Sequence, residues 1–189
     1  MKLEQSSKYF SKAEKLIPGC SQTFSKGYTQ FVNGVSPLFL EKGKGPLVWD
    51  ADGNELIDYI QGLLPNILGY TNERVNNAVK LQLDDGHSFS LPHRLELELA
   101  ELLCECIPCA EMVRYGKNGS DATAGAVRLA RAYTGRDRIA CCGYHGWQDW
   151  FIGTTTRSMG VPQAVQDLTH TFEYNNIESL HKLFATYPG

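Results

Sequence analysis

The residues best suited to chemistry lie in the stretch from Val113 to Gly146. Within it, Asn118, Gly119 and Ser120 form a short polar turn directly before an alanine-rich segment with helical periodicity. The first N–H groups of a helix have no partner inside the helix, and the helix dipole favours negative charge at that end. The N–H groups at positions 119 to 121, together with the Ser120 hydroxyl, would therefore form a cup for an anion, most naturally a phosphate group.

The same turn has a simpler interpretation. Asn-Gly-Ser before a helix is an ordinary N-cap, and such caps stabilise helices whether or not a ligand is present. Asp121 also places a carboxylate in the first turn, where it would compete with a bound anion. The Gly116-Lys117 pair precedes the turn, which is not the order of a Walker A loop. The turn alone leaves both interpretations open.

A second polar loop, Gly143-Tyr144-His145-Gly146, follows the next predicted strand. Open α/β sheets bind ligands beyond the carboxyl ends of their strands, so this loop and the turn would face the same side. A flat phosphorylated ligand needs an anchor for its phosphate and a surface for its ring, and the Tyr144 ring offers such a surface. His145 is interpreted either as an acid or base, because histidine changes charge near neutral pH, or as a hydrogen-bonding support.

The elements that would position these residues follow from periodicity and from Gly, Pro and Asn signals. Around the turn we expect a strand at 113–115, a helix at 119–133 and a strand at 138–142. Before it we expect helices at 6–17, 73–85 and 94–107, strands at 37–41 and 47–50, and a hairpin that pairs 47–50 with 54–58 across Asp52-Gly53. After it we expect a loop at 147–168, a strand at 170–174 and a helix at 177–186. Loops are expected at 61–70 and 87–92, and the 94–107 helix should turn its leucines (95, 99, 102 and 103) and Cys106 inward.

Bulk composition excludes several classes of protein. The chain has 189 residues, 42% hydrophobic and 21% charged, which is enough apolar material for a folded core and too little for a membrane protein. A net charge of −3 with no basic tract argues against nucleic-acid binding. The six cysteines lack the paired spacing of a zinc site, so we interpret them as reduced packing residues and expect no metal. A cytoplasmic protein with no membrane segment is the expectation.

Four segments carry a specific resemblance to a known family. They are Lys117–Ala122, the helix end Arg128–Arg136, the loop Cys142–Gly146, and the hairpin region Gly43–Tyr59. The chain resembles the class III aminotransferases of the pyridoxal-phosphate fold type I, and most of all their glutamate-1-semialdehyde aminomutase branch. That branch carries Asn-Ser-Gly-Thr-Glu-Ala, Arg-Leu-Ala-Arg-x-Tyr-Thr-Gly-Arg and Gly-Cys-Tyr-His-Gly at the first three places.

The resemblance implies the fold, the cofactor and the site. It implies a three-layer α/β/α large domain, incomplete here, at residues 59–189, preceded by a helix and β-hairpin segment at 1–58 that packs with a small domain. It implies pyridoxal 5'-phosphate as cofactor, an amino donor and a carbonyl acceptor as substrates, and a homodimer. The cofactor-binding residues would be Asn118, Gly119, Ser120, Tyr144 and His145. The family's Schiff-base lysine and ring-nitrogen aspartate fall beyond the residues matched, so this chain would be an N-terminal part, inactive alone, with Lys117 a solvated side chain.

Three departures from the aminomutase pattern concern substrate binding and gating. The stretch Cys20–Lys26 lacks the arginine that grips the substrate carboxylate in the aminomutase, and the segment 148–168 is shorter than its gating loop. The loop directly before Pro65 reads Gln61-Gly62-Leu63-Leu64 and lacks the tryptophan that the aminomutase carries there. The preferred function is an aminotransferase acting on an aldehyde or keto compound, possibly a sugar. A true glutamate-1-semialdehyde 2,1-aminomutase and a non-catalytic phosphate-ligand-binding chain remain as alternatives.

Overall fold

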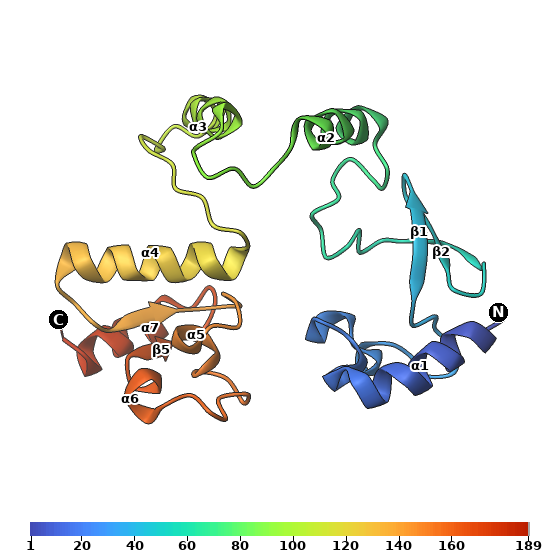
Figure 1. Ribbon diagram of the computed structural model, residues 1–189. Coiled ribbons are helices and arrows are strands. Elements are labelled where there is room, and N and C mark those ends of the chain that lie inside the picture. The colour runs from blue at the N-terminus through green and yellow to red at the C-terminus, as the bar shows by residue number, and fades with distance from the viewer. Residues whose placement is uncertain (189) are drawn as a thin grey trace. The chain divides into compact units, whose positions relative to one another are not determined.

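The computed structural model describes residues 1–188, which form two compact units, Met1–Pro92 and 93–188 (Figure 1). The first unit contains helix α1 (Glu4–Leu16), three 3-10 turns and helix α2 (Glu73–Asp85). Its sheet consists of β1 (Leu40–Lys44), β2 (Leu47–Asp50) and β3 (Glu55–Ile57), antiparallel in that order. The hairpin pairing predicted across Asp52-Gly53 is confirmed, with Val48 opposite Leu56. The first strand begins three residues later than predicted.

The second unit alternates helices with a pair of short strands. Helices α3 (Arg94–Cys106) and α4 (Gly119–Thr134) precede strand β4 (Ile139–Cys141). Two short helices, α5 (Asp149–Ile152) and α6 (Gln163–Gln166), lie in the segment predicted as a loop, and β5 (Thr169–Thr171) and α7 (Ile177–Thr186) follow. β4 and β5 pair in parallel, with Ala140 opposite His170. Parallel strands joined through helices make this unit α/β, as expected.

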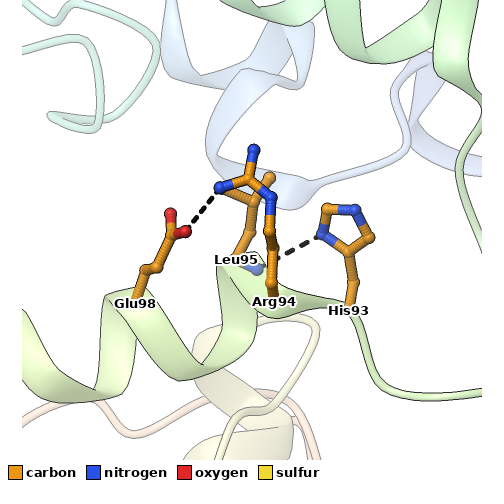
Figure 2. A network of polar contacts seen from close by, with 4 residues as sticks. All are labelled: His93, Arg94, Leu95 and Glu98. Carbon is orange, nitrogen blue, oxygen red and sulfur yellow. Dashed lines mark hydrogen bonds and ion pairs between the residues drawn. The ribbon is translucent and has the colours of Figure 1, made fainter.

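Local signals explain where the long helices begin and end. The Asn72 side chain accepts a hydrogen bond from the Val75 N–H at 3.2 Å, and Gly86 follows the last residue of α2. α4 ends at Gly135, whose φ of +67° suits a residue without a side chain. At α3 a histidine is the N-cap: the His93 ring nitrogen accepts from the Leu95 N–H, and Arg94 pairs with Glu98 one turn on (Figure 2). An imidazole nitrogen accepts only when it carries no proton, so this cap needs neutral histidine.

The α1 helix is capped by a residue far away in sequence. The Asp52 carboxylate, in the hairpin turn, accepts hydrogen bonds from the N–H groups of Gln5 at 2.7 Å and Ser6 at 2.9 Å. Burial by itself raises the pKa of this carboxyl, but these hydrogen bonds to the charged form outweigh it and leave the pKa below 3.8. A negative group at a helix N-terminus also matches the helix dipole.

This cap predicts a pH dependence for the first unit. The pKa of Asp52 is lower in the folded state than its value of about 3.8 in the unfolded state. The carboxylate therefore adds stability at pH values above 3.8, and this stability is lost as the pH falls through the folded-state pKa. We expect Asp52→Asn to remove this part of the acid sensitivity, measured as hydrogen exchange of the Gln5 and Ser6 amides between pH 5 and 3. Identical pH profiles for Asp52→Asn and the wild type would contradict the assignment.

The predicted loop at 61–70 has an unusual backbone. Gln61, Leu63 and Leu64 adopt left-handed conformations, with φ of +48°, +73° and +73°, which are uncommon for residues other than glycine. The Tyr70 hydroxyl anchors the end of the loop by donating to the Asp58 carboxylate at 2.6 Å. Burial and the carboxylate both raise the pKa of Tyr70. For Asp58, burial is outweighed by the hydrogen bonds it accepts, and its pKa is lowered. The loop is therefore held in a strained conformation from its ends.

Several sequence predictions about the core were wrong. Residues 113–115 form no strand, because no described segment pairs with them; a strand needs a neighbour for its N–H and C=O groups. The leucine face of α3 is not buried in the described residues, and Leu95, Leu99 and Leu102 are 44%, 46% and 54% exposed. Among the cysteines only Cys141 is buried, while Cys106 and Cys109 are exposed and so are not packing residues. Strand β5, predicted at 170–174, begins one residue earlier and ends three residues earlier than predicted.

The described residues contain neither a membrane-spanning helix nor a metal-binding cluster. In the part of the chain that the structure describes, no helix is long and apolar enough to cross a bilayer. Residues 1–188 also contain no cluster of three or more His, Cys, Asp or Glu side chains placed to hold a metal ion.

Candidate functional site

The first turn of α4 leaves two backbone N–H groups available. Asn118 is the N-cap, and its side-chain oxygen accepts from the Asp121 N–H at 3.0 Å. The Ala122 N–H bonds to the Asn118 carbonyl at 3.1 Å. Within the described residues, the N–H groups of Gly119 and Ser120 have no partner. The predicted cup therefore has two backbone donors rather than three, because the Asn118 cap uses the N–H of Asp121.

The loop after β4 folds back against this turn. His145 Nε2 lies 2.6 Å from the Cys142 carbonyl oxygen. A carbonyl oxygen only accepts, so Nε2 carries a proton and donates. Gly146 is buried with φ of +116°, and a Cβ built there would lie 2.4 Å from Ser120 Oγ. The loop backbone thus approaches Ser120 as closely as a residue without a side chain allows.

Hydrogen bonds join the loop to the helix. The Trp147 N–H donates to Ser120 Oγ at 3.4 Å, and Thr123 Oγ1 donates to the His145 carbonyl at 2.8 Å. Gln148 Nε2 donates to an oxygen of the Asp121 carboxylate at 3.2 Å. The Asp121 charge, which would oppose a bound anion, is thus partly satisfied by an amide donor.

Aromatic side chains of α5 pack against the loop. Phe151, on α5, is 4% exposed and packs edge-to-face with Tyr144, at 5.6 Å between ring centres, and with His145 at 5.4 Å. The His145 ring also stacks on Trp150 at 6.0 Å. Tyr144 itself is 75% exposed. The Tyr144 ring is therefore fixed on one side by Phe151 and largely open to solvent, whereas the His145 ring packs among its own loop and α5.

These contacts bring together the predicted site residues, all of which lie in the second unit. The turn at Asn118, Gly119 and Ser120 and the loop at Tyr144 and His145 are in direct contact through Ser120 and Thr123. Sequence reasoning missed Thr123, Gly146 and Phe151. Gly146 was visible as a glycine in the loop, but nothing in the sequence showed what it approaches.

A cavity of 480 Å³ lies beside this site rather than in it. It is lined by Val127, Arg128 and Arg131 of α4, with Ala124, and by residues 147–150. None of the predicted site residues lines it, because the turn and Tyr144 are on an open surface. An anion at a helix N-terminus needs no enclosed cavity, so the open turn beside Gly146 can serve as the site.

Comparison with known protein families identifies relatives over nearly the whole chain. A family model described as class-III aminotransferase matches residues 29–184. The chain is 38% identical over 200 residues to a glutamate-1-semialdehyde 2,1-aminomutase of Persephonella marina, covering 99% of this chain and 46% of that protein. It is 40% identical over 181 residues to a 3-aminobutyryl-CoA aminotransferase of Cloacimonas acidaminovorans, covering 95% and 43%.

Comparison with solved structures gives a similar result. The FumI protein of Sphingopyxis sp. MTA144, solved in its PLP internal aldimine form, matches with a TM-score of 0.86 and 31% identity. That match covers 97% of this chain and 44% of the other. The chain thus spans less than half the length of these relatives.

Proposed function

Because this chain belongs to the class III aminotransferases, we propose that it forms part of an enzyme that binds pyridoxal 5'-phosphate and moves an amino group from an amino donor to an aldehyde or keto acceptor. Its fold is that of the PLP-dependent transferases of fold type I, of which the chain covers a part. The observation that carries the proposal is the unpaired N–H pair of Gly119 and Ser120 beside the Tyr144 loop.

The residues present fit the phosphate of this cofactor. The N–H groups of Gly119 and Ser120 would donate to it, and the Ser120 hydroxyl would add a charge-assisted hydrogen bond. Ser120 Oγ already accepts from the Trp147 N–H, so its own proton is free to donate. Asn118 keeps the turn in shape as its cap.

The residues of the loop would face the cofactor ring. Tyr144, exposed and backed by Phe151, offers a flat surface for it. His145 would position the loop through its bond to the Cys142 carbonyl rather than exchange a proton with substrate. Once bound, pyridoxal phosphate supplies an electron sink for the bond-breaking step, and the protein supplies binding and orientation.

The lysine that reacts with the cofactor is proposed to lie in the part of the relatives' length that this chain does not span. Lys117 adjoins the cup, but it is exposed and sits immediately before the cap of α4. A side chain beside the phosphate donors is poorly placed to reach the opposite end of the ring. We expect borohydride reduction of the chain mixed with pyridoxal phosphate to give no single stoichiometric lysine adduct by mass spectrometry.

Glutamate-1-semialdehyde 2,1-aminomutase is the second candidate. It is favoured by the relatives that carry this name. It is opposed by the stretch Cys20–Lys26, which contains no arginine to hold a substrate carboxylate. Turnover of glutamate-1-semialdehyde by the whole protein, compared with its amino transfer to other carbonyl compounds, distinguishes the two.

We propose that residues 1–58 pack with a small domain, that residues 59–189 begin the large domain, and that the protein is a cytoplasmic homodimer. The open leucine face of α3 supports an assembly in which further protein covers it, since apolar surface of this kind is costly in water.

Replacing Ser120 with alanine tests the cofactor site. We expect the dissociation constants of inorganic phosphate and of pyridoxal phosphate to rise about ten- to a hundred-fold, because a charge-assisted hydrogen bond contributes roughly 1.5–3 kcal/mol. Tyr144→Ala should weaken only pyridoxal phosphate binding, since inorganic phosphate has no ring. Both are measured by calorimetric titration.

Ser158→Ala, in the same unit but outside the site, is the control and should change neither constant. A shift below about two-fold for Ser120→Ala would mean that the turn is a plain helix cap.

A further inference from the structure

The contact between the Tyr144 loop and α4 depends on two residues that have no place in the proposed binding set. Gly146 is one, because any side chain there would collide with Ser120 Oγ, 2.4 Å from the position of its Cβ. Thr123 is the other, one turn along the helix from Ser120 and on the same face. Both residues act on the position of Ser120 relative to the loop.

The Thr123 hydroxyl has two carbonyl oxygens within reach. It lies 2.8 Å from the His145 oxygen and 3.1 Å from the Ser120 oxygen. A hydroxyl has one proton, so its full hydrogen bond goes to the nearer acceptor, His145. That bond spans 22 positions of the sequence and fixes the loop backbone next to Trp147.

The neighbouring bond, from the Trp147 N–H to Ser120 Oγ, is long at 3.4 Å. It persists only while the loop stays close to the helix, because N–H···O hydrogen bonds are usually about 2.7–3.2 Å long and this one is already longer. While it is made, one lone pair of Ser120 Oγ is occupied and the hydroxyl is left as a donor.

We propose that Thr123 and Gly146 are positioning residues that clasp the Tyr144 loop to α4 and so keep the Ser120 hydroxyl ready to donate to an anion. The hydroxyl then acts with the unpaired N–H groups of Gly119 and Ser120 as one set of donors. The anion part of this inference rests on the proposed function, whereas the clasp itself rests on the contacts above.

The first test is a double-mutant cycle with inorganic phosphate as the probe, titrated by NMR at the Gly119 and Ser120 amides. Thr123→Val, which keeps the shape but loses the hydroxyl, should raise the dissociation constant about five-fold, and Thr123→Ser should restore it to within about two-fold. In a Ser120→Ala background, Thr123→Val should add less than about two-fold. Equal effects of Thr123→Val in both backgrounds, or no effect in either, would overturn the proposal.

The second test needs no ligand. Hydrogen exchange of the Trp147 amide should accelerate about five-fold or more in Thr123→Val and in Gly146→Ala. Gly143→Ala is the control: its φ is also positive, at +78°, but its Cβ would meet nothing within 4 Å. Unchanged Trp147 exchange in Thr123→Val, or equal acceleration in the two glycine variants, would refute the clasp. If the wild type binds no phosphate, the proposed function fails. The hydrogen exchange of the Trp147 amide still tests whether Thr123 and Gly146 hold the loop against α4.

Discussion

Phe151→Ala is expected to lower the free energy of unfolding of the second unit by about 3–5 kcal/mol, the usual cost of removing a buried phenylalanine. Phe151 is 4% exposed and is the shared neighbour of the Tyr144, His145 and Trp150 rings. Its loss removes apolar burial and three edge-to-face contacts together. Urea denaturation followed by circular dichroism measures the change.

The effect should also reach the proposed site. Without Phe151 the Tyr144 ring loses the only side chain among the described residues that packs against it ring to ring, so pyridoxal phosphate affinity should fall with stability. Phe151→Leu keeps most of the apolar volume and should cost about 1–1.5 kcal/mol. Phe184, 58% exposed on α7, is the control, and Phe184→Ala should cost less than about 1 kcal/mol. Equal losses for the two alanine variants would show that Phe151 is not a core residue.

The elements that the sequence predicted well are those with local signals. α2 begins and ends where Asn72 and Gly86 indicate, and α7 has the predicted bounds. Caps and turns are made by residues three or four positions apart, so they are visible in the sequence. The hairpin at Asp52-Gly53 was predictable for the same reason.

The elements that were predicted wrongly depend on partners far away in the chain. The apolar stripe of α3 is present as predicted, but periodicity shows only which face is apolar and not what covers it. Residues 113–115 have strand-like composition, yet no described segment lies beside them to complete a ladder. α5 and α6 have only four residues each, too short for any periodicity to show.

The same distinction between local and distant contacts applies to the candidate site. The turn at Gly119 and Ser120 was predicted because a helix N-terminus is a local feature. The clasp was not, because Thr123 and the His145 carbonyl are 22 positions apart and meet only through the packing of the loop on the helix. The sequence therefore indicated which groups could bind a phosphate but not what keeps them in place.

A second large effect is expected at Asp50, a buried carboxylate of the first unit that accepts three hydrogen bonds. It is 2% exposed and accepts from the N–H groups of Asp52 at 3.0 Å and Asn54 at 2.7 Å. Its other oxygen accepts from Asn54 Nδ2 at 2.7 Å, and the same Nδ2 donates to the Lys2 carbonyl at 2.7 Å. Asp50 thus holds both the hairpin turn and, through Asn54, the start of the chain.

Asp50→Ala should therefore destabilise the first unit by about 3 kcal/mol, because it leaves part-buried donors without an acceptor and removes bonds to a charged group. Asp50→Asn should cost about half as much, since one oxygen remains for the two backbone N–H groups while the amide opposes Asn54 Nδ2. Asp84→Ala, on the exposed end of α2, should change stability by less than about 0.5 kcal/mol. The measurement is urea denaturation followed by the Asn54 and Gln5 amide signals. Both signals should disappear at a lower urea concentration in Asp50→Ala, because loss of the turn also displaces the Asp52 cap of α1; a shift at Asn54 alone would mean that the turn and the helix are not coupled through Asp50.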